Sequence, residues 1–428
     1  MTERHSSRQL RRTDGRRLRA AVAVAALVLG ALAVGVGALP RVPAATARAD
    51  EVTASQDPLR DGWDRNEPGL SPAIVGGPSF GQLFSTAVNG QVYAQPVIAG
   101  STVIVATEND YVYGLNAVTG AVQWSDSLGP PMPSTAQASC GDLTPDNGAT
   151  SAPVYDPSTG TVYLVATVND GPTVSQPHYY LYAMSAQTGT IQWQVPIQGA
   201  PVNEPTRPFN PFTERQRAGL LLMNGSVYMS FGSYCDFSPY IGYVAGVNTS
   251  SHAVTLWTDE AGLTDTQAGI WLGGGGLMSD GSGRIFVASG NGVSPAPGPG
   301  GSPPSELGGS VIRLNVAAGG ALSAADFFSP ANAPTLDAED LDFGSGGPVG
   351  LPFGTASDPH AGTGRQGRPG VLAEPQQPRR KGTRSRRHRR RRQPGGAIRR
   401  PVGAPGGVRR HIHGGNGLIK RLRLLPWP

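Results

Sequence analysis

Short runs of alternating apolar and polar residues dominate the chain from about residue 79 onward. One unit reads QPVIAGSTVIVATENDYVYGLNAVTGAVQW, from Gln95 to Trp124. It holds an apolar run, a Gly turn, a second apolar run, an alternating run, a Thr-Gly turn and a last run that closes in Trp. Alternation with a period of two places successive side chains on opposite faces of a strand. No long segment has apolar residues at helical spacing. The pattern therefore predicts an all-β chain of short strands.

The same unit returns three times along the chain, the last time more loosely: from Ser151 to Trp193, from Gly219 to Trp257 and from Gly273 to Asn315. The closing tryptophans of the first three copies lie 69 and 64 residues apart. Repetition at this period, with about four strands per copy, is typical of propeller blades. We predict a β-propeller of four-stranded blades. We expect each Trp to lie across a blade junction and the turn Gly to adopt a positive φ.

Two segments, Leu115 to Trp124 and Met184 to Trp193, share the pattern Ala-x-Thr-Gly-x-x-x-Trp. This pattern resembles the repeat of quinoprotein (PQQ-type) propellers, and the copy that ends at Trp257 matches it in part. The resemblance covers about residues 79–357 and implies the propeller fold. It implies less about activity, because the same repeat occurs in PQQ-dependent dehydrogenases and in non-catalytic scaffolds.

Charge divides the chain into parts of opposite sign. Residues 1–50 carry nine Arg against three acidic residues, residues 51–358 carry seven Arg against 26 acidic residues, and residues 359–428 carry 19 Lys and Arg against one Glu. An acidic surface repels phosphate backbones, so we expect no nucleic-acid partner for the propeller itself. The predicted organisation is a targeting segment (1–49), a polar lead (50–78), the blades (79–357) and an Arg-rich tail (358–428).

The first 49 residues have the order of an export signal: several Arg, an uncharged apolar run over residues 20–39, and small residues near 47–50. Cleavage there would secrete the protein, whereas an uncleaved run of 20 residues would anchor it in a membrane. Both alternatives predict an extracytoplasmic location. In such a compartment Cys140 and Cys235 are predicted to form a disulfide, the alternative being two separate buried thiols.

The tail contrasts with the blades, because its Arg-rich text from about residue 358 has almost no acidic residues and no strand periodicity. The genetic code permits residues 359–384 and 411–427 to be re-read in a shifted frame. Both re-readings regain Gly-containing turns and alternating strands. Our hypothesis is a frameshift near Ser357, which would leave a propeller without its final blades and a disordered tail. The alternative is a genuine polycation that binds nucleic acid without sequence preference.

One segment bears on cofactor chemistry. Ser289-Gly290-Asn291-Gly292 resembles a segment that supplies an Asn ligand to Ca²⁺ in quinoprotein alcohol dehydrogenases. The resemblance makes Asn291 a weak candidate for PQQ and Ca²⁺ binding. The chain lacks the adjacent Cys-Cys pair of those enzymes, and a plain turn is the favoured interpretation.

Other candidate groups are interpreted as structural. The acidic cluster at residues 337–342 is interpreted as a solvated loop, with cation binding as the alternative. The Gly run at 273–276 lacks the Lys and helix of a phosphate-binding loop and indicates close backbone packing. His178, His252 and His360 have no His, Ser or Asp partner at a spacing that predicts catalysis, and are interpreted as solvated loop residues.

The sequence thus favours an exported, non-catalytic binding or scaffolding module for a protein or carbohydrate ligand, although it leaves open whether the protein is an enzyme. The alternative is a PQQ- and Ca²⁺-dependent dehydrogenase that ends before its full site. A second alternative is a nucleic-acid binder that acts through its basic tail.

Overall fold

The chain divides into two compact units, Met1–Arg48 and Ala49–Pro428. The computed structural model describes only parts of the second unit. They are residues 50–64, 69–78, 80–136, 143–237, 239–262, 264, 266–281, 283–296, 298–299, 302–355, 358–365, 368–373 and 421–424. The predicted signal or anchor lies outside the described residues. None of the helices in these ranges is long and apolar enough to cross a membrane.

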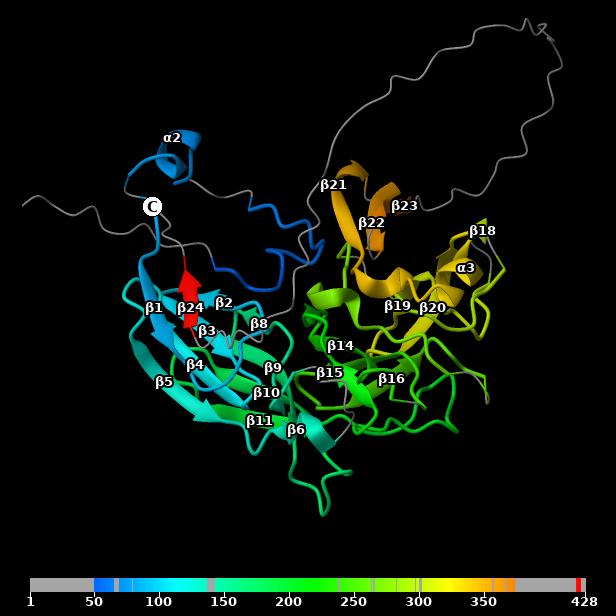
Figure 1. The fold of residues 1–428 in the computed structure, drawn as a ribbon, viewed down its shortest axis with the longest axis horizontal. Coiled ribbons are helices and arrows are strands. Elements are labelled where there is room, and N and C mark those ends of the chain that lie inside the picture. The colour runs from blue at the N-terminus through cyan, green and yellow to red at the C-terminus, as the bar shows by residue number, and fades with distance from the viewer. Residues whose placement is uncertain are drawn as a thin grey trace, which may run out of the picture. The chain divides into compact units, whose positions relative to one another are not determined.

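The first two sheets are four-stranded antiparallel meanders (Figure 1). The first has the order β2-β3-β4-β5, with strands Val97–Ala99, Thr102–Ala106, Tyr111–Asn116 and Val122–Ser127. The second has the order β11-β10-β9-β8, with β8 Val154–Asp156, β9 Thr161–Val168, β10 His178–Ser185 and β11 Ile191–Pro196. Each sheet corresponds to one predicted repeat.

The third sheet follows the same meander, with β13, β14, β15 and β16 at Leu221–Met223, Ser226–Ser233, Tyr243–Asn248 and Val254–Thr258. A further short strand, β12 (Glu214–Gln216), pairs with the far end of β14. The fourth sheet has the order β17-β19-β20-β18, with strands Arg284–Ala288, Val311–Val316, Leu322–Ser329 and Gly298–Pro299. Its inner edge is extended by an antiparallel bridge between Met278 and Phe286.

The last sheet has three strands, β21 (Val349–Thr355), β22 (Asp358–Arg365) and β23 (Arg368–Ala373). Strands β22 and β23 lie in the segment that was predicted to be a disordered tail. That prediction depended on the lack of alternating side chains, whereas antiparallel pairing requires only backbone N–H and C=O groups. Residues 374–420 lie outside the described residues. The frameshift and the loss of final blades stay predictions.

Smaller elements complete the described residues. Strand β1 (Phe84–Ala87) pairs with β24 (Arg421–Leu424), and β6 (Met132–Pro133) pairs with β7 (Asp146–Asn147). The helices are short: α2 (Pro72–Val75), α3 (Ala333–Ala338) and the 3₁₀ turns η1 (Ser134–Ala136), η2 (Leu272–Gly274) and η3 (Phe343–Ser345). The prediction of an all-β chain is confirmed.

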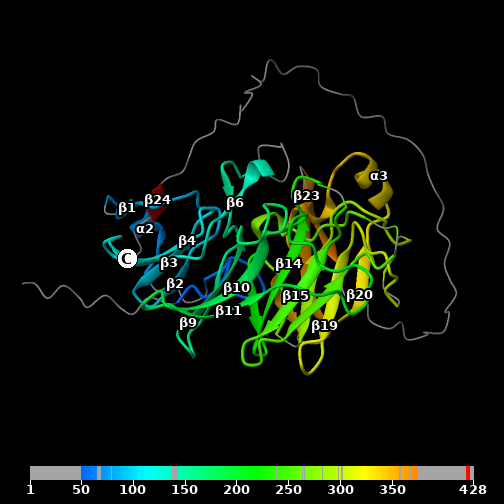
Figure 2. The same ribbon diagram turned by 90° about the horizontal axis from the view of Figure 1, so that it is seen from below.

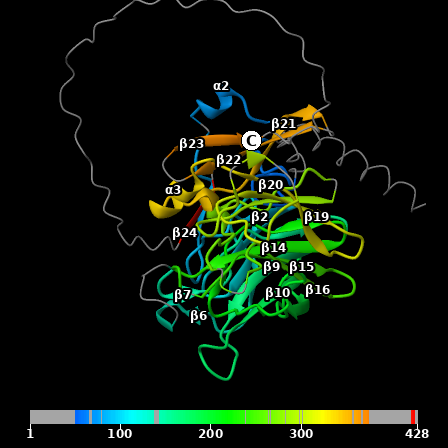
Figure 3. The same cartoon turned by 90° about the vertical axis from the view of Figure 1, so that its right-hand side faces the viewer.

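Hydrophobic clusters join the first four sheets, each to the next. One cluster contains Ile104 of the first sheet and Leu164 of the second, another contains Leu181 and Val227, and a third contains Trp257 and Ile312. Figures 2 and 3 show the corresponding sheets side by side, with β9–β11 next to β14 and β15, and those next to β19. The described core therefore consists of successive sheets packed face to face, as in a propeller.

The closing tryptophans lie at these junctions, as predicted. A Cβ on Gly189, in the Thr-Gly turn of the second sheet, would lie 2.4 Å from Cε3 of Trp124 in the first. Trp193 in turn packs against His252, with ring centroids 4.5 Å apart. His252 has a φ of 60° and occupies the turn position that Gly120 and Gly189 hold in the first two sheets. His252 is exposed and lies in a turn, as predicted, and its ring also packs against the Trp193 indole at a blade junction.

The polar lead crosses the inner edges of the sheets. Carbonyl groups of the lead accept hydrogen bonds from backbone N–H groups of four sheets: Glu51 from Ile98, Val52 from Tyr155, Pro58 from Ser279 and Leu59 from Gly350, at 2.7–2.9 Å. The innermost strands would otherwise present unpaired backbone groups. Residues 50–60, which we call the strap, therefore supply backbone partners to the inner edges of these sheets.

Arg60 completes the strap from a fully buried position. Its Nη2 donates to the carbonyl of Leu220 at 2.8 Å and its Nε to that of Leu277 at 3.0 Å, so it connects the third and fourth sheets. Its Nη1 donates to Thr53 and Ala54 within the strap. Burial lowers the pKa of Arg60 to about 10, and the guanidinium remains charged at neutral pH.

Candidate functional site

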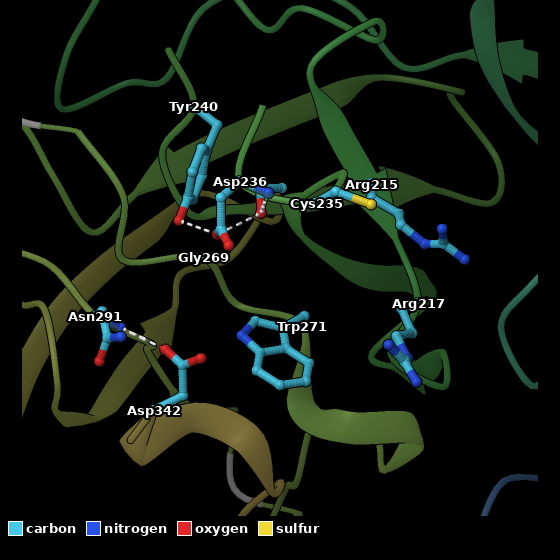
Figure 4. A pocket seen from close by; sticks show the side chains of 10 residues that line it. Arg215, Arg217, Cys235, Asp236, Tyr240, Gly269, Trp271, Asn291 and Asp342 are labelled. Carbon is cyan, nitrogen blue, oxygen red and sulfur yellow. Dashed lines mark hydrogen bonds between the residues drawn. The ribbon is translucent and has the colours of Figure 1, made fainter. Parts of the chain in front are cut away.

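A polar pocket of about 190 Å³ lies between the third and fourth sheets (Figure 4). Arg215 comes from β12, and Cys235 and Asp236 come from the loop that follows β14. Trp271 precedes η2, Asn291 follows β17, and Asp342 precedes η3. Segments far apart in the chain therefore supply its walls.

One side of the pocket is cationic. Arg215 is buried, its Nη2 lies 3.4 Å from Oγ1 of Thr150, and its guanidinium carbon lies 5.3 Å from the centroid of the Tyr234 ring. Arg217 lies two residues further on, and its guanidinium carbon is 5.8 Å from the centroid of the Trp271 indole. Figure 4 shows both arginines on the same side, with the indole between them and the opposite wall. Two guanidinium groups present donors suited to a carboxylate.

The opposite wall is acidic and contains Asn291. The backbone N–H of Asn291 donates to Oδ1 of Asp342 at 2.8 Å, and its side-chain Nδ2 donates to Oδ1 of Asp340 at 3.0 Å. The N–H of Gly292 donates to Oδ1 of Asp337 at 3.1 Å. The structure thus brings together two features that the sequence analysis treated separately, Asn291 and the acidic cluster. The cluster caps the Asn291 turn and is not simply a solvated loop.

Burial in the acidic wall raises the pKa of Asp342 and of Tyr240, and so favours the protonated form of each. Burial raises the pKa of Asp342, and the nearby carboxylates of Asp340, Asp236 and Asp337 raise it further, while the hydrogen bond from Asn291 opposes the shift. Asp236 accepts hydrogen bonds from the hydroxyl of Tyr240 at 2.8 Å and from that of Ser233. Burial and this bond to Asp236 raise the pKa of Tyr240. A ligand would therefore meet hydrogen-bond acceptors on this side.

The described residues around Asn291 do not supply the oxygen ligands of a Ca²⁺ site. Calcium takes about six to eight oxygen ligands, whereas the described part of the chain contains no group of three or more His, Cys, Asp or Glu side chains that could hold a metal. The carboxylates beside Asn291 accept hydrogen bonds from its N–H groups and do not converge on a common point. The pocket is also smaller than the roughly 300–1,000 Å³ typical of drug-sized ligands. Asn291 stays only a weak candidate.

The other sequence candidates are placed as follows. Cys235 lines the pocket and Cys140 lies outside the described residues, so their disulfide stays a prediction. His178 pairs with Asp170, with Nδ1 and Oδ1 2.6 Å apart. In the Gly run, a Cβ on Gly276 would lie 2.8 Å from the guanidinium of Arg60, in agreement with close packing.

The sequence analysis missed Arg215, Arg217, Tyr240 and Trp271. A signal was present for the arginines, because they stand two residues apart on a chain segment with only seven Arg in about 300 residues. On a strand, such a spacing places both side chains on one face. No comparable signal in the sequence marks Trp271, because its place in the pocket depends on the path of its segment in the folded chain.

The sheets, their Trp junctions and the strap define the class of protein as a β-propeller. A family model with PQQ-type repeats, described as outer membrane protein assembly factor BamB, matches residues 80–262. Over these residues the chain resembles the PQQ-repeat β-propellers, as predicted. No curated protein sequence matches it.

Solved structures with this fold include quinohemoprotein alcohol dehydrogenase ADHIIG from Pseudomonas putida HK5, with 15% identity and a TM-score of 0.52 over 76% of this chain and 46% of that one. A europium-containing methanol dehydrogenase has 12% identity and a TM-score of 0.52 over 76% of this chain and 56% of that one. The chain thus spans about half the length of these two dehydrogenases. At such low identity the similarity shows the fold alone.

Proposed function

We propose that this protein is an extracytoplasmic, non-catalytic binding module whose polar pocket takes a small hydroxylated carboxylate, such as a sugar acid. The observation that carries the proposal is the division of one pocket into two walls. Arg215 and Arg217 form one wall, and Asp236 with Asp342 forms the other.

The ligand chemistry follows from this division. A carboxylate suits the guanidinium wall, because ionised donor and acceptor make strong, often bidentate hydrogen bonds. Hydroxyl groups suit the acidic wall, because they donate to carboxylates. The indole of Trp271 offers a flat apolar surface between the two walls. The volume of about 190 Å³ favours a single small ring over a polymer.

A binding role is supported more than a catalytic one. No His is among the residues that line the pocket, so its Ser and Cys side chains have no imidazole base, and its oxygen donors do not fit Ca²⁺. The family description names an assembly factor rather than an enzyme, which supports a protein partner for the propeller as a whole. The basic, then apolar, amino-terminal residues support export.

The test is isothermal titration of the full chain with glucuronate and with glucose, which differ by one carboxylate. Glucuronate is expected to bind at least about ten-fold more tightly, the effect of one charge-assisted interaction. Arg217→Gln should remove this preference. Arg313→Gln is the matched control, since Arg313 lies on β19, outside the pocket, and its Nη2 is 3.6 Å from Asp326. Equal binding of the two sugars, or binding of neither, would refute the proposal.

A separate assay addresses the catalytic alternative. The full chain is incubated with PQQ and Ca²⁺, and dye reduction is followed with alcohols or sugars as substrates. We expect no turnover above the level without protein. Turnover that requires both PQQ and Ca²⁺ would instead identify a dehydrogenase.

A further inference from the structure

A second, larger cavity of about 700 Å³ lies next to the polar pocket and is lined by residues of β12, β15 and the loops around them. Its lining includes Arg207 and Phe209 from the loop that precedes β12, Glu214 of β12, and Tyr243 of β15. Tyr240 lines both spaces. The volume lies within the range of roughly 300–1,000 Å³ typical of sites for small organic ligands.

Glu214 is the unusual member of this lining. Its side chain is 2% exposed, and its Oε1 accepts a long hydrogen bond of 3.4 Å from the N–H of Ile241. A hydrogen bond with the Thr213 side chain also acts on this carboxyl group and lowers its pKa. Its Oε2 is buried and has no hydrogen-bond partner among the described residues. A buried carboxylate oxygen that lacks a hydrogen-bond donor is costly for the folded state. This oxygen is therefore a vacant acceptor at the wall of a cavity.

A second buried carboxylate adds to the negative potential. Asp259, just after β16, is fully buried, and neither of its carboxylate oxygens has a side-chain partner among the described residues. Burial raises the pKa of both Glu214 and Asp259 well above the usual range, and the charge of Glu214 raises that of Asp259 further. Both shifts come chiefly from burial, which disfavours the charged form of a carboxyl group.

Apolar surface lies next to this acceptor. Phe209 and Tyr243 are buried, with ring centroids 5.4 Å apart and an interplanar angle of 85°. Aromatic faces and edges of this kind accommodate the carbon skeleton of a ligand, and aromatic faces attract cations. The cavity thus combines a vacant carboxylate oxygen with an aromatic corner.

We propose that this cavity is a second binding site, which takes an organic ammonium ion whose charge pairs with Glu214 and whose apolar part lies against Phe209 and Tyr243. An ammonium group supplies both the missing donor and the missing charge. A neutral polyol supplies only the donor and leaves the Glu214 carboxylate without a counter-charge. The single guanidinium in the lining, that of Arg207, is half-buried and belongs to the loop that precedes β12.

The test is isothermal titration of the full chain with benzylamine and with benzyl alcohol, which have the same ring but differ in charge. Benzylamine is expected to bind at least about ten-fold more tightly. This comparison uses the wild-type protein and does not depend on the folding of any variant. Equal affinities, tighter binding of benzyl alcohol, or binding of neither would overturn the proposal.

Two variants locate the site. Glu214→Gln keeps the size of the side chain and should lower benzylamine affinity about ten-fold while leaving benzyl alcohol affinity unchanged. Asp110→Asn is the matched control, because Asp110 is an equally buried carboxylate that does not line the cavity. An equal loss of benzylamine affinity in both variants would overturn the assignment to Glu214.

The benzylamine titration tests this cavity separately from the polar pocket. Glu214→Gln should retain glucuronate binding, because Glu214 does not line that pocket. Loss of one ligand without the other therefore shows which of the two proposals fails.

Discussion

The blade junction at Trp124 allows a quantitative test of the packing. The indole lies between two glycines, since a Cβ on Gly114 of β4 would lie 2.2 Å from its Nε1 and one on Gly189 would lie 2.4 Å from its Cε3. Gly189 also has a φ of +76°. The change Gly189→Ala therefore adds two effects, a backbone strain at positive φ and an overlap with the ring.

A second glycine separates these effects. Gly160 has a φ of +69°, but a Cβ there would meet nothing within 4 Å. Gly160→Ala should cost only the backbone strain, about 1–2 kcal/mol. Overpacking adds about 1–3 kcal/mol, so Gly189→Ala should cost about 2–5 kcal/mol.

Urea denaturation followed by fluorescence and circular dichroism measures both costs. In a Trp124→Leu background, Gly189→Ala should cost no more than Gly160→Ala, because the overlapping ring is gone. If Gly189→Ala and Gly160→Ala destabilise the wild-type chain equally, Trp124 does not pack on the turn of the next sheet, and the account of the blade junctions is wrong.

Two further predictions concern buried charges. Arg60→Met should lower the free energy of unfolding, measured by urea denaturation, by about 3–5 kcal/mol, since it removes the donors to the carbonyls of Leu220 and Leu277. A decrease below about 1 kcal/mol would contradict the role of the strap. Burial, together with the charge of Glu108, raises the pKa of Asp110 well above its usual range, so the folded state binds this proton more tightly than the unfolded state. Stability should therefore fall as pH rises from about 4 towards the folded pKa, by about 1.4 kcal/mol per unit of pKa shift. Asp110→Asn should flatten this profile between pH 4 and pH 8 and be more stable than wild type at pH 8; an unchanged profile would show that Asp110 is not the group that titrates.

The position of each repeat could be predicted from the chain because its signals are local. Alternation determines which side chains share a face of a strand, and the spacing of Trp124, Trp193 and Trp257 marks the end of each sheet. The Thr-Gly turns follow from backbone sterics at Gly120 and Gly189, both of which have positive φ. His252 shows the limit of this reasoning, because a packed ring stabilises a turn that no local rule predicts there.

The polar pocket and the strap could not be predicted from the sequence, because both depend on contacts between distant segments. Asn291 and Asp342 are about 50 residues apart, and their hydrogen bond exists only because α3 and the following turn bring the chain back across the end of β17. The polar lead carries no strand pattern, yet it pairs with the inner edges of the sheets, because those edges present backbone groups that need partners. Local patterns determine strands and turns, since both depend on neighbouring residues. Sites depend on which strand ends meet, and that is determined by the packing of whole sheets.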